Sequence, residues 1–142
     1  LAYAAKKIRP DAMIDLATLT GAVVVALGHE LTGVMGNDDG LIQSLVEAGK
    51  RTSEMAWHLP ILDLHKKEMK GMVGDLKNIS GPATGAGSST GGAFLSHFVE
   101  ETPWAHLDIA GSAWGAAQRD YQGGEQGTGV GVRLLIDYLE SI

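Results

Sequence analysis

Two short runs of small residues have the composition of a substrate pocket. The run 18–21 follows an apolar run at 12–16, and the run 110–113 follows an apolar run at 104–109. In open α/β sheets, ligands bind beyond the carboxyl ends of the strands. Small side chains leave volume for a substrate there, and glycine lets backbone amides approach it closely. Close packing of a strand against a helix accounts for the same composition, so the pattern alone leaves both interpretations open.

Two acidic side chains are the candidates for metal chemistry. Asp15 and Asp108 lie on two different predicted strands, so they could approach each other in the fold. A buried carboxylate needs partners, which leaves two interpretations of the pair. One is hydrogen bonding within the chain, which we favour, and the other is a carboxylate pair that holds a metal ion.

The five histidines do not have the spacing of a metal site. His58 and His65 are seven positions apart, but Pro60 stands between them, so no shared helical face is predicted. His106 lies in an apolar strand, which is typical of a hydrogen-bonded core histidine. We therefore assign no histidine to a metal ion.

A glycine-rich run at residues 85–91 superficially resembles a phosphate-binding loop. It lacks the lysine that follows such loops and the strand that precedes them. Its serines also miss the Gly-x-Ser-x-Gly spacing of a nucleophile elbow. We therefore predict neither nucleotide binding nor a serine nucleophile at this run.

Hydrophobic periodicity predicts the elements that must position these residues. Continuous apolar runs predict buried strands, and apolar residues three and four positions apart predict amphipathic helices. The expected strands are 12–16, 31–35 and 104–109, and the expected helices are 1–9, 22–27, 41–54, 61–69, 130–139 and a helix from Ser89 or Thr90 to Glu100. Expected connections and loops are 18–21, 37–40, 57–60, 73–79, 80–91, 110–115 and 120–129.

The ends of three helices carry specific expectations. Asp38 or Asp39 is expected to cap the helix at 41–54, and Gly28 is expected to end the helix at 22–27. No capping residue precedes the first helix, so we expect its beginning to have been cut away. The inward face of the closing helix is expected to consist of Val132, Leu135, Ile136 and Leu139.

Strands that alternate with helices predict an α/β fold. We expect a three-layer sandwich with a mostly parallel (mixed) sheet flanked by helices, truncated on its N-terminal side. A length of 142 residues fits one domain of common size. We therefore interpret residues 1–142 as a single, incomplete domain.

Composition excludes several classes of function. The formal net charge is −6 and no cluster of lysine and arginine forms a basic face, which argues against binding to nucleic acid or to an anionic membrane. Cysteine is absent, which excludes disulfides and thiolate metal sites and is compatible with the cytoplasm. The longest apolar runs are shorter than the ~20 residues of a membrane span.

Several motifs, taken in order, resemble one family of enzymes. The segment Pro10-Asp-Ala-Met-Ile-Asp-Leu-Ala-Thr-Leu-Thr-Gly-Ala22 is similar to a segment of the leucyl aminopeptidases, also called cytosol aminopeptidases. Further matches in the same order are Trp57-His58-Leu59-Pro60, Asp75-Leu76-Lys77-Asn78-Ile79, Gly92-Ala93-Phe94-Leu95 and Trp104-Ala105-His106-Leu107-Asp108-Ile109-Ala110-Gly111. The agreement extends over essentially the whole chain, so we identify it as the C-terminal part of the family's catalytic domain.

The resemblance implies a function and an assembly. Such enzymes release N-terminal residues, preferably leucine, from peptides by means of water activated by two divalent metal ions, zinc or manganese. They assemble as homo-hexamers, each a dimer of trimers. The resemblance therefore implies three partners for this chain: a peptide substrate, the missing N-terminal part of the protein, and further copies of the protein.

The resemblance also implies roles for individual residues. Thr18, Leu19, Thr20 and Gly21 match positions on the substrate side of the site, and the backbone carbonyl of Leu19 would face the substrate amine or a bound bicarbonate. Ala110 and Ala113 match positions in the pocket for the N-terminal side chain. Some family members have methionine where this chain has Ala113, so this chain would leave more room in that pocket.

The metal ligands and catalytic residues of the family lie in segments that would end just before Leu1. We therefore assign no metal ligand and no catalytic residue to this chain, and we expect the isolated chain to be inactive and to expose an apolar face. The alternative is a non-catalytic peptide-binding or assembly module of the same fold. A reading frame that continues upstream through the metal-binding motif would favour the enzyme.

Overall fold

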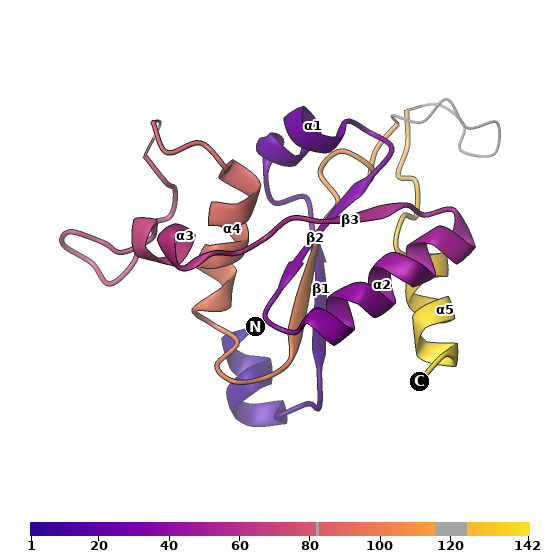
Figure 1. Cartoon of the computed structure of the whole chain (residues 1–142), viewed down its shortest axis with the longest axis horizontal. Helices are drawn as coiled ribbons and strands as arrows, with labels where there is room; N and C mark the ends of the chain where they lie inside the picture. The colour runs from indigo at the N-terminus through magenta and orange to yellow at the C-terminus, as the bar shows by residue number, and fades with distance from the viewer. Residues whose placement is uncertain (82, 116–124) are drawn as a thin grey trace.

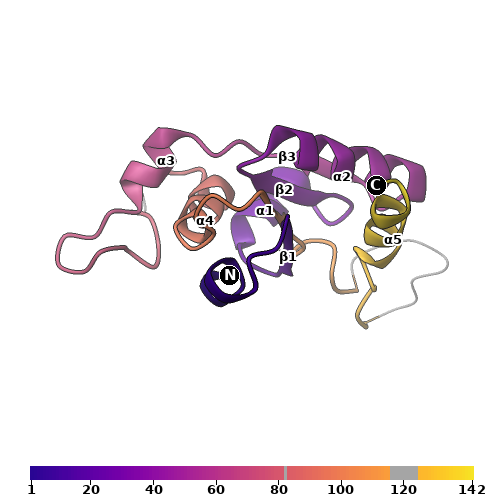
Figure 2. The same ribbon diagram turned by 90° about the horizontal axis from the view of Figure 1, so that it is seen from below.

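The structure of the chain is a computed structural model that describes residues 1–81, 83–115 and 125–142. A four-stranded sheet lies between two layers of helices, as the two ribbon views show (Figures 1 and 2). The strands are β1 (Met13–Ala17), β2 (Thr32–Gly36), β3 (Ala56–His58) and β4 (Trp104–Asp108). The helices are η1 (Ala4–Ile8), α1 (Gly21–Leu27), α2 (Asp39–Thr52), α3 (Asp63–Glu68), α4 (Gly87–Ser96) and α5 (Val132–Glu140). The expected α/β sandwich is confirmed.

The sheet is mixed, and its strand order is β1-β4-β2-β3. β1 pairs with β4 and β2 pairs with β3 in parallel, whereas β2 and β4 are antiparallel. The parallel pairing of β1 with β4 places their carboxyl ends at the same edge of the sheet. The runs 18–21 and 110–113 therefore leave the sheet side by side, although they are far apart in the sequence.

Each face of the sheet packs against its own set of helices. One face carries Val34 and Leu107, which pack with residues of α2 and with Leu134 of α5. The other face carries Trp104, which packs with Met13 and with Ala5 of η1. The second layer also contains α1 and α4, which contact each other and β2. Because helices cover both faces of the sheet, side chains that point to either face are buried, and the strands are mostly apolar in sequence.

Helix α2 forms as its sequence predicts. Asp38 accepts a hydrogen bond of 2.7 Å from the backbone N–H of Leu41, which is the expected N-cap. Leu41, Ile42, Leu45, Val46 and Ala48 are all buried on the side that faces the sheet and α5. The expectation for α1 is also confirmed, because this helix ends at Gly28 with a positive φ of 70°.

Helix α4 corrects the expected loop at 80–91. It begins at Gly87 and ends at Ser96, so it starts before Ser89 and Thr90 and stops before Glu100. The reason is tertiary, because a Cβ atom on Gly91 would lie 2.9 Å from Thr20 Cγ2 and one on Gly87 would lie 2.7 Å from Ala22 Cβ. The small residues allow α4 to pack closely against the segment around α1, and this outweighs their weak helix propensity.

Strand β3 corrects the expected connection at 57–60. Ala56–His58 pairs in parallel with β2, and the N–H of Leu59 donates to the carbonyl of Val34 at 2.8 Å. Trp57 and His58 are exposed, so only Ala56 of the strand is buried. A strand of three residues with one buried position is too short to show a period.

Helix α5 was expected to bury a different face. Leu134 is buried, but Val132, Ile136 and Leu139 are 58%, 52% and 60% exposed, so three of the four expected inward positions are wrong. The helix is held by Glu54, which accepts hydrogen bonds from the N–H groups of Gly131 and Leu134. This anchor turns Leu134 toward the core, with Leu135 and Tyr138 packed beside it.

The other differences concern element boundaries. The first helical segment takes π-helical form at Ala4–Ile8 and ends at Arg9, which has a left-handed φ of 53°. Helix α3 is shorter than the expected 61–69. The expected loop at 120–129 lies partly outside the described residues. No helix within the described ranges is long and apolar enough to cross a membrane.

Candidate functional site

Asp108, the last residue of β4, joins the two runs of small residues. Its side chain is fully buried. Oδ1 accepts hydrogen bonds from the N–H groups of Leu19 at 3.1 Å, Thr20 at 3.4 Å and Ala110 at 3.3 Å. Oδ2 accepts a bond of 2.6 Å from the hydroxyl of Thr20. One carboxylate therefore holds the residues after β1 and the residues after β4 together.

Thr20 extends this network to α1 and α4. Its Oγ1 caps α1 by accepting from the N–H of Val23 at 3.2 Å, and it lies 3.2 Å from Oγ of Ser88 on α4. Leu19 is 37% exposed, and Thr18 and Gly21 are also exposed. The backbone of the run 18–21 is therefore held by hydrogen bonds on the side of Asp108, while its other side is exposed to solvent.

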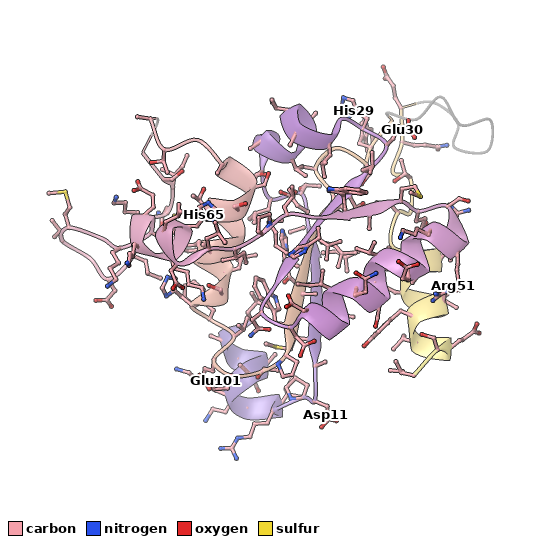
Figure 3. All side chains as sticks on the ribbon, in the orientation of Figure 1. Asp11, His29, Glu30, Arg51, His65 and Glu101 are labelled. Atoms are coloured by element: carbon pink, nitrogen blue, oxygen red, sulfur yellow. The ribbon has the colours of Figure 1, made fainter. Side chains whose placement is uncertain are left out.

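The loop after β4 is held on several sides. The carbonyl of Ile109 accepts from the N–H groups of Ser112 and Ala113 at 3.1 and 2.9 Å. Oγ of Ser112 lies 2.9 Å from Oγ1 of Thr32 in a buried hydrogen bond. His29, labelled just after α1 in Figure 3, donates from Nδ1 to the carbonyl of Gly111 at 2.9 Å. The position of this loop is thus set by hydrogen bonds to Ile109, at its own start, and to Thr32 and His29.

A cavity of about 820 Å³ adjoins the run 18–21. Leu19, Thr20 and Gly21 form one wall, and residues 85–91 at the start of α4 form another. The remaining lining is largely apolar and includes Val25, Leu59, Met69, Ile79 and Phe94. A cavity of this size with a largely apolar lining lies within the range of small-molecule binding sites.

The predicted substrate residues therefore divide into two groups. Leu19, Thr20 and Gly21 line the cavity, whereas Thr18, Ala110 and Ala113 do not. The bonds through Asp108 nevertheless bring Ala110 beside Leu19 and Thr20. The cavity wall contributed by α4 was missed in the sequence because those residues were interpreted as a loop. Its many small side chains were the available signal.

The acidic and histidine candidates serve the fold. Asp15 accepts from Nε1 of Trp104 and from Nδ1 of His106, both at 2.7 Å. Asp108 is saturated by other donors, so the two carboxylates do not act as a pair and the hydrogen-bonding interpretation is favoured. His65 accepts from the N–H of Leu62 at 3.1 Å within the first turn of α3.

Divalent metal ions do not fit the residues that the structure describes. Across 1–81, 83–115 and 125–142, no three carboxylate, histidine or cysteine side chains gather in a way that could hold an ion. The oxygens of Asp15 and Asp108 already accept hydrogen bonds from the chain.

Glu68 holds a loop that lines part of the cavity. Its Oε1 accepts from the N–H of Gly81 at 3.2 Å and lies 3.6 Å from Nζ of Lys77. The hydrogen bond from Gly81, followed by those from Thr84 and the charge of Lys77, lowers the pKa of the Glu68 carboxyl from its ordinary value. The ionised form of this side chain therefore helps to hold Lys77, Gly81 and Thr84 against α3.

Comparison with known proteins identifies the family. Residues 1–136 match the model of the cytosol aminopeptidase family, catalytic domain. The chain belongs to the cytosol aminopeptidase family. The family match covers both strand-end runs and the cavity residues described above.

Its curated relatives are much longer than the chain. A probable cytosol aminopeptidase of Geobacter sp. (strain M21) is 52% identical over 140 residues, which are 95% of this chain and 27% of that protein. One of Geobacter sulfurreducens is 50% identical over 98% of this chain and 27% of its own length. One of Neisseria meningitidis serogroup A is 47% identical over 97% of this chain and 28% of its own length. The chain thus spans about a quarter of these relatives and corresponds to their C-terminal part.

Proposed function

We propose that this chain forms the substrate-binding wall of a metallo-aminopeptidase that releases N-terminal residues, preferably leucine, from peptides. One observation carries the proposal: two runs of small residues, 18–21 and 110–113, share one buried carboxylate beside an apolar cavity. The names of the relatives support it, because each is called a probable cytosol aminopeptidase.

Individual residues then have distinct roles in the proposal. The carbonyl of Leu19 faces the substrate amine, and Thr18 and Gly21 lie beside it on the substrate side of the site. Ala110 and Ala113 border the pocket for the N-terminal side chain of the peptide. The cavity lined by Leu19, Thr20 and Gly21 takes a neighbouring apolar part of the peptide. None of these residues moves a proton or holds a metal. They bind and orient the peptide.

The remaining parts of the proposal lie outside this chain. The ligands of the two divalent metal ions, zinc or manganese, belong to a preceding part of the protein, because the described residues do not offer them. The complete protein assembles as a homo-hexamer in the cytoplasm. The net charge of −6 is consistent with a protein that does not bind nucleic acid.

The test is a chimera in which this chain replaces the matching 140-residue segment of the Geobacter sp. (strain M21) relative. Release of p-nitroaniline from leucine p-nitroanilide is measured with added Mn²⁺, and a leucine hydroxamate serves as inhibitor. Inhibitable turnover by the chimera supports the proposal. An inactive, folded chimera beside an active relative contradicts it. Hydroxamate binding without turnover would instead favour a peptide-binding module.

A further inference from the structure

We propose that Asp108 is a positioning residue that aims the carbonyl of Leu19 at the substrate and locks the two substrate-binding runs into one unit. The inference rests on the proposed function, because it assigns the residue that organises the same site. Asp108 touches neither the cavity nor the exposed side of the runs, so it acts through their backbone.

The first argument is the burial of a carboxylate without a cation. Asp108 is fully buried, and within the described part of the chain it forms no salt bridge. Burying a charge is costly unless hydrogen-bond donors converge on it. Its donors here are three backbone N–H groups and one hydroxyl. The carboxylate therefore strongly favours the one arrangement of both runs that directs these donors inward.

The second argument is the geometry of the peptide bond between Leu19 and Thr20. The structure contains no cis peptide among the described residues, so the C=O and N–H of this unit point in opposite directions. The N–H of Thr20 points at Asp108. The carbonyl of Leu19 must therefore point away from Asp108, toward the open side of the run. The carbonyl of Leu19, which is proposed to face the substrate amine, is thus oriented by the hydrogen bond from the N–H of Thr20 to Asp108.

The third argument is that the same oxygen holds the other run. Oδ1 accepts from Ala110 as well as from Leu19 and Thr20. A change in the position of Leu19 is thereby transmitted to the wall formed by Ala110. Binding sites need such fixed geometry, because displacements of about 1 Å reduce rates by as much as ~100-fold.

Asp15 supplies a matched control. It is also a carboxylate on the sheet, and it accepts hydrogen bonds from two side chains, Trp104 and His106. Its described hydrogen bonds reach neither run. Asp108→Asn and Asp15→Asn therefore remove comparable charges from the same sheet, and only the first removes a link to the proposed site.

The experiment compares these two variants in the chimera by kinetics and by deuterium exchange of the peptides that cover residues 18–21 and 109–111. We expect Asp108→Asn to raise exchange in both peptides about tenfold or more and to lower kcat/KM by about 10- to 100-fold through a higher KM. We expect Asp15→Asn to change neither exchange in these peptides nor KM by more than about threefold.

Thr20 tests the same link where Asp108→Asn does not fold. Thr20→Val removes the hydroxyl that donates to Oδ2, and Thr20→Ser retains it. Faster exchange in Thr20→Val and protection in Thr20→Ser support the inference. Unchanged exchange in both Asp108→Asn and Thr20→Val overturns it, as does an equal rise in KM for Asp15→Asn. A parent chimera without turnover refutes the proposed function, while the exchange data still decide the role of Asp108.

Discussion

Gly111 provides a stringent test of the geometry at the end of β4. In Gly111→Ala, the new Cβ would lie 2.2 Å from the carbonyl oxygen of Gly28 and 3.3 Å from the carbonyl carbon. Real Cβ atoms keep at least 3.0 Å from such atoms, so the backbone must shift by at least 0.8 Å, the difference between the two distances. Both partners are backbone, so no flexible side chain can absorb the shift. Overpacking of this kind lowers the free energy of unfolding by about 1–3 kcal/mol.

The assay measures urea unfolding and kcat/KM of the chimera carrying Gly111→Ala. Because the displaced loop contains Ala110 and Ala113, we expect kcat/KM to fall by about 10- to 100-fold together with the stability. Gly127→Ala is the control, because beyond its chain neighbours no atom of the described residues lies within 4 Å of its added Cβ and its φ is not positive. An unfolding midpoint and kcat/KM equal to those of the Gly127 variant would refute the close approach of the two backbones.

Three further predictions concern the core, the cavity loop and specificity. Glu54→Gln should lower the free energy of unfolding by about 1–3 kcal/mol, because the neutral side chain accepts weaker hydrogen bonds from the N–H groups at the start of α5 and loses its ion pair with Arg133. Glu47→Gln, on the exposed side of α2, should leave the urea midpoint unchanged. Folding lowers the pKa of the Glu68 carboxyl, so the stabilisation that this side chain provides is present above the ordinary carboxyl pKa and is lost as pH falls through the pKa of the folded state. The urea midpoint should therefore depend less on pH in Glu68→Gln than in the parent protein. An equal pH dependence of the midpoint in the two proteins would contradict this prediction. Ala113→Met should lower kcat/KM for phenylalanyl relative to alanyl p-nitroanilide by about tenfold if this residue borders the side-chain pocket.

The sequence predicted elements whose pattern is set locally. β1 and β4 are mostly apolar runs, and α2 has both its cap at Asp38 and a periodic apolar face. The position of the runs 18–21 and 110–113 directly after two strands was also predicted, since both follow apolar runs. In these cases, the local pattern and the tertiary structure favour the same answer.

The errors arise where tertiary contacts override the local pattern. Glycine and serine are typical of loops, yet α4 uses them to approach Thr20 and Ala22 closely. Helix α5 has apolar residues on more than one side, and its orientation depends on the hydrogen bonds from Glu54, a residue 77 positions away from Gly131. Hydrophobic periodicity in the sequence cannot predict a hydrogen bond between residues so far apart.

The site shows the same division. Leu19, Thr20 and Gly21 could be placed from their position after a strand, and they do line a cavity. The role of Asp108 could not be derived from the sequence, because its partners Leu19 and Thr20 lie 89 and 88 positions away. The sequence could suggest only that a carboxylate in a buried strand needs partners.

The central place of β4 in the sheet has a consequence for how the chain folds during synthesis. β4 joins β1 to β2, yet it lies in the last third of the sequence. Until Asp108 has left the ribosome, β2 can pair only with β3, and β1 has no neighbour among the described strands. The contacts that complete the sheet are thus of high sequence separation, which slows folding. We therefore expect β1 and β2 to lack these neighbours until β4 has been synthesised, and the nascent chain to need protection from aggregation until β4 inserts.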